Sequence, residues 1–179
     1  HVISEGRLEE ACIKIEDEMR DRVKELLHEG KRPEADRLQQ RVINDLMMLR
    51  ETGFCSGGEN YSRHFAGRDA GEPPDTLMDY LGLHGDWLLV VDESHVALPQ
   101  LKAMYGGDQA RKRLLVKHGY RLPSALDNRP LQESEFWDQI TKAVFVSATP
   151  AKQELSLAER EPVEMMIRPT FVCDPTIQV

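Results

Sequence analysis

The residues best suited to chemistry in this sequence are two adjacent carboxylates, Asp92 and Glu93, which directly follow the apolar run Trp87–Val91. A continuous apolar run rich in β-branched residues is typical of a strand buried on both faces of a parallel sheet. Carboxylates at the C-terminal end of such a strand suit Mg²⁺ and a nucleotide phosphate, because one can hold the cation and the other can orient an attacking water. The alternative is an acidic turn that simply follows a strand.

A second short apolar run, Ala143–Val146, is closed by Ser147, Thr149 and Pro150. The interval between Asp92 and Ser147 is long enough for a right-handed helical crossover between two parallel strands. We therefore expect Asp92 and Ser147 side by side at one edge of a single sheet, facing the place where a triphosphate would bind.

The N-terminal part of the chain predicts a hairpin of two antiparallel helices. Ser4 is a suitable N-cap, Gly30 is a suitable stop, and Pro33 suits the first turn of a second helix that ends near Gly53. Each helix carries one apolar stripe at a spacing of three to four residues. The stripes are Leu8, Cys12, Ile15, Met19, Val23 and Leu26 in the first helix, and Leu38, Val42, Leu46 and Leu49 in the second.

A long connection, residues 52–74, is rich in glycine and proline and is expected to be a loop. Within it, Arg63 and His64 end the polar segment Glu59–His64 and could contact phosphate. The other interpretation of this segment is a structural loop.

The remaining basic residues concentrate on a helix predicted from Asp108 to His118, after a break at Gly106–Gly107. This cluster faces either a phosphate backbone or solvent. Its members are Arg111, Lys112, Arg113 and Lys117. Short helices are predicted near residues 76–83 and 133–139, a loop at 120–130, and a further strand at 163–167.

Composition excludes several classes of protein. The formal net charge is −8, which gives no support to a generally basic nucleic-acid-binding surface. No apolar run approaches the length of a membrane span, which is about 20 residues. Three widely spaced cysteines indicate reduced thiols and a cytoplasmic setting rather than disulfides. The histidines His64, His84, His95 and His118 fit no zinc spacing with these cysteines.

The strings Asp92-Glu93-Ser94-His95 and Ser147-Ala148-Thr149-Pro150 resemble the second and third motifs of superfamily 2 helicase-type ATPases. Longer strings across nearly the whole chain resemble the UvrB family, the damage-verifying subunit of bacterial nucleotide excision repair. These strings include Cys55–Gly57, Glu59–His64, Gly71–Pro74 and Arg121–Pro130.

This resemblance implies ATP and Mg²⁺ as cofactors. Asp92 would lie near Mg²⁺, and Glu93 would polarise the water that attacks the γ-phosphate. Ser94 and His95 would complete motif II. The motif III residues that would couple nucleotide state to DNA are Ser147, Ala148 and Thr149. The possible DNA or phosphate contacts are Arg63, His64, Arg121 and Arg129. UvrA, UvrC and damaged DNA would be the partners.

The expected fold is α/β, with a partial RecA-like (P-loop NTPase, helicase-type) parallel sheet and an N-terminal helical hairpin subdomain. Residues 1–75 would form the hairpin and loop subdomain, and residues 76–170 part of the first RecA-like lobe. Residues 171–179 would begin a linker to a second lobe.

Two features depart from a complete ATPase. The sequence contains no GxxxxGK[ST] loop to bind the phosphates, and Ala151–Gln153 follows motif III where the family usually has Gly-Pro. The chain, which begins with His1, is therefore expected to be an internal piece of a longer protein, holding half an active site and inactive alone. The alternative is a non-catalytic protein-interaction module whose working surface is the helical hairpin.

Overall fold

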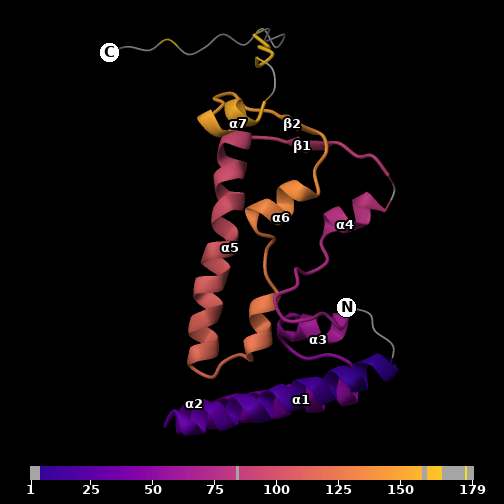
Figure 1. The fold of residues 1–179 in the computed structure, drawn as a ribbon, viewed down its shortest axis with the longest axis vertical. Coiled ribbons are helices and arrows are strands. Elements are labelled where there is room, and N and C mark those ends of the chain that lie inside the picture. The colour runs from indigo at the N-terminus through magenta and orange to yellow at the C-terminus, as the bar shows by residue number, and fades with distance from the viewer. Residues whose placement is uncertain (1–4, 84, 159–160, 167–175, 177–179) are drawn as a thin grey trace.

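The computed structural model describes residues 5–83, 85–158, 161–166 and 176. Two long helices, α1 (Glu5–His28) and α2 (Arg32–Thr52), pack side by side as the predicted hairpin (Figure 1). Their apolar stripes meet as expected, with Leu8 and Val23 packed at the margin of the buried cluster. The cluster comprises Ala11, Cys12, Ile15, Met19, Leu26, Ala35, Leu38, Val42, Leu46, Leu49, Cys55, Tyr61, Phe65 and Leu122.

The segment predicted as a loop at 59–64 is instead helical. It forms a 3₁₀ turn, η1 (Gly58–Tyr61), followed by α3 (Ser62–Ala66). Tyr61 and Phe65 are buried against the hairpin, and the Tyr61 hydroxyl donates to Asp45 Oδ2 at 2.7 Å. Burial of these two rings stabilises the helical conformation of this segment, which the glycine-rich sequence around it does not predict.

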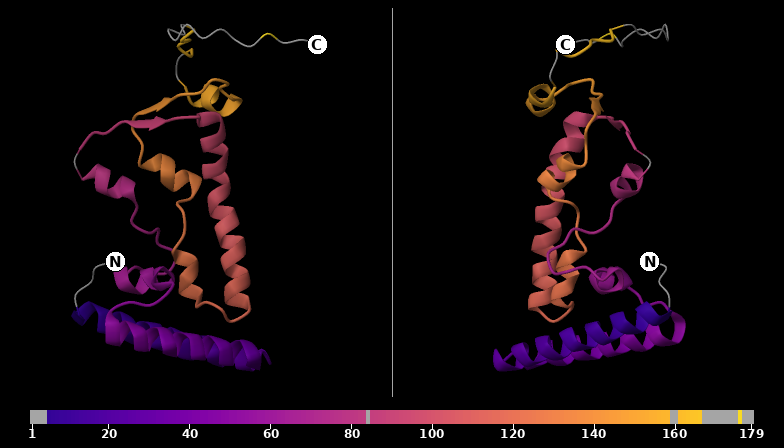
Figure 2. Two further views of the ribbon diagram at one scale, coloured as in Figure 1. Left: turned by 180° about the vertical axis from the view of Figure 1, so that it is seen from behind. Right: turned by 45° about the vertical axis from the view of Figure 1, so that its right-hand side comes forward.

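The elements from α4 (Leu77–Gly82) onward form a second group, which lies above the hairpin in both views of Figure 2. Strands β1 (Leu89–Val91) and β2 (Ala143–Phe145) pair in parallel, in the register Leu89–Ala143, Val90–Val144 and Val91–Phe145. The predicted parallel pairing is thus confirmed, as a small two-stranded sheet. The elements are α4 (Leu77–Gly82), β1 (Leu89–Val91), α5 (Ser94–Lys117), η2 (Pro123–Asp127), α6 (Glu133–Asp138), β2 (Ala143–Phe145) and α7 (Lys152–Leu157).

The strand predicted at 87–91 was expected to be buried on both faces, and that prediction is wrong. Its residues alternate, with Val90 58% exposed and its partner Val144 44% exposed. On the other face the Trp137 ring of α6 packs edge-on against Phe145, with ring centroids 6.3 Å apart. Among the described residues no further strand pairs with this sheet. The exposure of Val90 and Val144 shows that one face of it meets solvent.

The helix break predicted at Gly106–Gly107 is also wrong, because α5 runs unbroken through both glycines and through Pro99. Contacts on both sides of the glycines outweigh their cost, which is about 1 kcal/mol each. The Arg129 guanidinium lies 5.3 Å from the centre of the Tyr105 ring, and Gln109 donates to the Leu126 carbonyl at 2.8 Å. The predicted 120–130 loop contains the 3₁₀ helix η2, which makes this last contact.

The C-terminal end of α5 meets the start of α2 at Gly119. This residue has φ +69°, and a Cβ there would collide with the Glu34 carbonyl. Beside it, Arg37 donates to the His118 carbonyl and stacks 4.4 Å from the centre of the Tyr120 ring. The close backbone approach requires glycine at this position.

The strand predicted at 163–167 is not formed at residues 161–166, which have no regular structure, and Ile167 lies outside the described residues. Ser4, and residues 171–179 apart from Thr176, lie outside them as well. None of the helices among the described residues is long and apolar enough to cross a membrane.

Substituting Leu26 tests the packing of the hairpin. Leu26→Ala should lower the free energy of unfolding of the chain by about 2–5 kcal/mol, because it deletes a fully buried side chain. Leu27→Ala is the matched control on the same helix, since Leu27 is 49% exposed, and it should cost less than about 1 kcal/mol. Urea unfolding followed by circular dichroism measures both. Equal losses would contradict the assigned buried face of α1.

Candidate functional site

The segment Asp92–His95 and the segment Ser147–Pro150 lie next to each other at the ends of the two parallel strands. Past the last strand pair, the Val146 amide donates to the Val91 carbonyl at 2.9 Å, and the Ser94 amide donates to the Val146 carbonyl at 3.1 Å. Asp92 and Ser147 therefore leave the sheet at the same edge. The predicted position of both residues at one edge of a single sheet is confirmed. That this edge faces a bound triphosphate stays a prediction.

Side chains connect the motifs directly. Ser147 Oγ lies 2.7 Å from His95 Nδ1, and the same His95 nitrogen lies 3.5 Å from Glu93 Oε2. The Thr149 amide donates to Ser147 Oγ at 3.1 Å. That hydroxyl donates to His95 Nδ1 when the nitrogen is unprotonated and accepts from it when the nitrogen carries a hydrogen, and only a protonated Nδ1 can donate toward Glu93. Close polar contacts thus run from Glu93 past His95 and Ser147 to the Thr149 backbone.

The two carboxylates at this edge are open to a ligand. Asp92 is exposed, its Oδ1 accepts the Glu93 amide hydrogen at 2.9 Å, and the Glu93 side chain is 66% exposed. Among the described residues no lysine or arginine forms an ion pair with either carboxylate. Ala148 and Thr149 are also exposed on this side of the chain. The roles assigned to these residues stay predictions.

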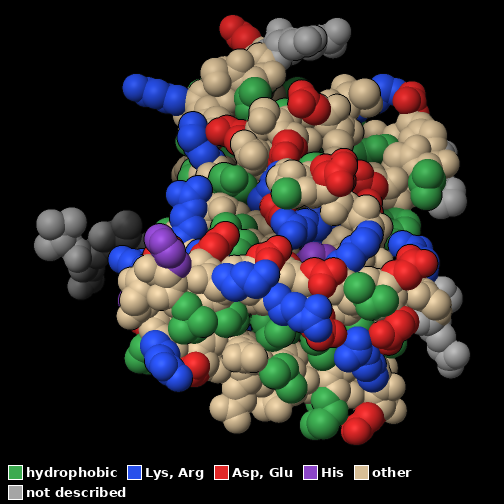
Figure 3. Space-filling model, turned by 60° about the horizontal axis from the view of Figure 1, so that its bottom comes forward, with side chains coloured by type: hydrophobic (Ala, Val, Ile, Leu, Met, Phe, Trp, Pro, Cys, Tyr) green, Lys and Arg blue, Asp and Glu red, His purple; other side chains and the backbone are tan. Residues whose placement is uncertain are grey.

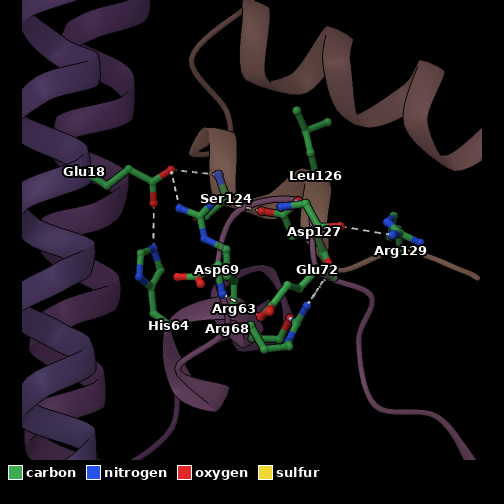
Figure 4. Close-up of polar contacts among 12 residues, drawn as sticks. Glu18, Arg63, His64, Arg68, Asp69, Glu72, Ser124, Leu126, Asp127 and Arg129 are labelled. Carbon is green, nitrogen blue, oxygen red and sulfur yellow. Dashed lines mark hydrogen bonds and ion pairs between the residues drawn. The ribbon is translucent and has the colours of Figure 1, made fainter.

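Arg63 and His64, predicted as phosphate contacts, are engaged within the protein (Figure 4). Arg63 pairs with Asp127 Oδ2 at 2.7 Å and with Glu18 Oε1 at 3.6 Å. His64 Nε2 lies 2.6 Å from Glu18 Oε2, and its side chain is 8% exposed. These pairs join α1, α3 and η2, so both residues hold the hairpin unit to the rest of the chain. Their contact with phosphate stays a prediction.

Glu18 is the centre of this partly buried network. Burial acts to raise the pKa of its carboxyl, but hydrogen bonds with His64 and Ser124 outweigh burial and hold the pKa below its ordinary value. The Ser124 amide donates to Glu18 Oε1 at 2.7 Å. Sequence patterns do not indicate this role, because Glu18 lies on a helix with many other acids and its partners are distant in the chain.

Arg121 and Arg129 line a pocket of about 350 Å³ between η1, α5 and the segment after it. Arg129 is held by Glu135 through two hydrogen bonds of 2.7 and 2.8 Å, which outweigh burial and raise the pKa of its guanidinium. Arg121 donates to the Tyr120 carbonyl at 3.2 Å. No carboxylate in the described part of the chain forms an ion pair with Arg121, which leaves it available to an anion.

The basic cluster predicted on α5 is divided by the fold. Lys112 is 4% exposed, pairs with Asp108 Oδ2 at 2.9 Å and donates to the Asn128 carbonyl. Arg111 also lines the pocket and pairs with Asp108 at 3.2 Å, whereas Arg113 and Lys117 are exposed. One of the four cations is therefore a buried structural group. The sequence could not show this, because its partners are set by tertiary packing.

The hairpin surface, the alternative working surface, carries mixed charge. Figure 3 shows acidic and basic side chains interspersed over this face, and several form pairs such as Arg20–Glu16 and Arg50–Glu9. An open groove of about 600 Å³ crosses it, lined in part by Ile43 and Met47.

No group of three histidine, cysteine or acidic side chains that could hold a metal ion occurs within the described ranges, and His84 lies outside them.

The N-terminal part of the chain matches a known family of protein domains. Residues 6–67, the hairpin with η1 and α3, match the family described as the UvrB third helical domain.

Nearly the whole chain matches one kind of protein. Over 178 residues, 99% of the chain, it is 57% identical to the UvrABC system protein B of Cyanothece sp. and to that of Nostoc sp.. It is 54% identical to the protein of that name from Synechococcus elongatus. The predicted resemblance to UvrB is confirmed. The match spans 26% of the length of these relatives.

The Glu18 network should make stability depend on pH. A carboxyl whose pKa is lowered by folding contributes stability that is present above its unfolded pKa, about 4.3, and is lost as the pH falls through the folded pKa. Glu18→Gln should therefore be less stable than the wild type at about pH 7, and the difference should shrink toward about pH 3. Urea unfolding across this range measures it. The exposed control Glu25→Gln should change little, and a difference for Glu18→Gln that does not vary with pH would contradict the assignment.

Proposed function

We propose that this chain is a segment of an ATP-dependent, DNA damage-verifying subunit of excision repair, and that it carries motifs II and III of the ATPase. The observation that supports this most is the meeting of Asp92, Glu93, His95 and Ser147 at one edge of a parallel strand pair. In this proposal residues 76–170 are part of a first RecA-like lobe. The names of the relatives support the excision repair role.

The donor set at the strand ends fits ATP with Mg²⁺. Mg²⁺ takes oxygen ligands and retains several waters, and Asp92 offers an exposed carboxylate at the sheet edge with which no lysine or arginine of the described ranges pairs. When bound, ATP with Mg²⁺ supplies the phosphoanhydride bond that is hydrolysed. Asp92 would hold the cation or its waters, and Glu93 would orient the attacking water and accept its proton.

Ser147 and Thr149 would couple the bound state of the nucleotide at this edge to the engagement of DNA. His95 Nδ1 lies close to both Glu93 and Ser147, so a movement of the Glu93 carboxylate would change which of the two that nitrogen contacts. Ser147 in turn accepts the Thr149 amide, which continues the chain toward α7. UvrA, UvrC and damaged DNA are the proposed partners of the longer protein.

The second candidate function is a protein-interaction module. The observation that favours it is the groove on the hairpin, in which Ile43 and Met47 are about half exposed. The two functions are compatible, since the groove and the strand ends lie on different elements.

The ATPase proposal predicts a sharp difference between the chain and a longer protein. The 179-residue chain alone should hydrolyse no ATP, because it has no phosphate-binding loop. A chimera in which this chain replaces the matching stretch of the Cyanothece relative should hydrolyse ATP. In this chimera Glu93→Gln should abolish turnover and preserve ATP binding, as measured by phosphate release and equilibrium binding.

Two results would contradict this prediction. One is Mg²⁺-dependent turnover by the chain alone that Glu93→Gln removes. The other is normal turnover in the chimera carrying Glu93→Gln, which would show that Glu93 does not orient the water.

The pocket lined by Arg121 and Arg129 predicts an effect on DNA binding that is separate from ATP hydrolysis. Arg121→Ala in the chimera should weaken binding of labelled single-stranded DNA equally across sequences and reduce the salt slope by about 1, because one phosphate contact is lost. Fluorescence anisotropy at several salt concentrations measures this. Arg113→Ala is the control, an exposed arginine on α5 outside the pocket, and should leave the slope unchanged. Identical slopes for the wild type and Arg121→Ala would exclude a phosphate contact at Arg121.

A further inference from the structure

Glu154 is a buried carboxylate on α7, 4% exposed, for which the ATPase motifs assign no role. Its Oε1 accepts the Ser94 hydroxyl hydrogen at 2.9 Å, and its Oε2 accepts the Ala151 amide hydrogen at 3.0 Å. Ser94 is fully buried and directly follows Glu93. The Glu154 side chain therefore connects α7 to Ser94, the residue next to the proposed base Glu93. Figure 1 shows α7 against the junction of β1 and α5.

The backbone of Glu93 needs such an anchor. Its φ is 45° and its ψ is 46°, and it is the only non-glycine residue with positive φ in the part of the chain that is described. A left-handed conformation costs an L-residue about 1–2 kcal/mol and persists only where its neighbours enforce it. Asp92 holds this residue on one side, through the hydrogen bond to the Glu93 amide.

Ser94 holds Glu93 on the other side. Its amide donates to the Val146 carbonyl, and its hydroxyl donates to Glu154. If Ser94 were released, Glu93 could relax to an ordinary right-handed conformation. The helix α5 would then begin one residue earlier, and the Glu93 side chain would turn to a different direction around the helix axis.

We infer that Glu154 is a positioning residue, which fixes Ser94 and thereby holds the Glu93 carboxylate in the direction that the hydrolytic reaction requires. This inference rests on the proposed function of Glu93 as the residue that orients the water. Burial acts to raise the pKa of Glu154, but hydrogen bonds from the α7 backbone and from Ser94 outweigh it and lower the pKa, so the anchor is ionised at neutral pH.

Activity of the chimera tests this role. Glu154→Ala and Ser94→Ala should each lower kcat for ATP hydrolysis by about tenfold or more and change KM for ATP by less than about twofold, since the anchor acts on the transition state and not on nucleotide binding. Glu154→Gln should restore most of kcat, because its amide can donate to Ser94 Oγ and still accept from Ala151. Lys152→Ala, an exposed position on the same helix, is the control and should leave kcat unchanged.

A double substitution separates positioning from general support of α7. If Glu154 acts through Ser94, the double variant Ser94→Ala/Glu154→Ala should be no slower than the slower single variant. If the two losses multiply instead, Glu154 acts through other contacts and the inference is wrong.

Amide hydrogen exchange tests the effect of Glu154 on the Glu93 backbone without a measurement of activity. The amides of Val96 and Ala97 donate to the Glu93 carbonyl at 2.9 and 3.0 Å, so their exchange reports the Glu93 backbone. In the 179-residue chain, Glu154→Ala should speed exchange at these amides and at Ser94, whereas Lys152→Ala should not. Unchanged exchange at all three amides would overturn the inference.

The outcomes for the inference and for the proposed function differ. If Glu93→Gln retains turnover, the proposed function itself fails. If Glu93→Gln abolishes turnover while Ser94→Ala and Glu154→Ala keep wild-type kcat, the proposed function stands and the inference fails. If Glu154→Ala does not fold, Ser94→Ala decides the matter, because it removes only one hydroxyl, and a wild-type kcat would then overturn the inference.

Discussion

The parallel pairing of β1 with β2 is the constraint on which the candidate site depends. Parallel strands present their C-terminal ends at the same edge, so pairing Val91 with Phe145 places the residues after each strand next to one another. The hydrogen bond from the Ser94 amide to the Val146 carbonyl carries this alignment past the last strand pair. Any slip in register would separate Ser147 from His95 and break the contact between the two motifs.

Charge, rather than apolar surface alone, attaches the helical hairpin to the elements that carry this site. Glu18 on α1 pairs with Arg63 and His64 of α3 and accepts the Ser124 amide of η2. Buried pairs of this kind are costly to break one partner at a time, because the remaining charge is left without compensation. They therefore fix the relative position of segments that are far apart in the chain, as the close approach of Gly119 to α2 also does.

Local sequence patterns were sufficient to predict the hairpin, its buried stripes and the meeting of Asp92 with Ser147, because periodicity and strand order determine these features. They were insufficient where tertiary contacts override local preference. The glycine pair within α5 is held helical by contacts such as Gln109 with Leu126, which no local pattern reveals. Glu154 was missed for the same reason. Its hydrogen bonds to the Ala151 amide and to Ser94 arise only from the fold.

In the proposed function, motifs II and III form one nucleotide site at the strand ends. A crystal structure of the chimera with ADP, Mg²⁺ and a fluoride analogue of the transferred phosphate would show whether they do. We expect the cation or its waters at the Asp92 carboxylate, the phosphate analogue facing Glu93, and the hydrogen bond between Ser147 and His95 in place. Nucleotide bound elsewhere, or Asp92 and Ser147 at opposite ends of the sheet, would contradict it.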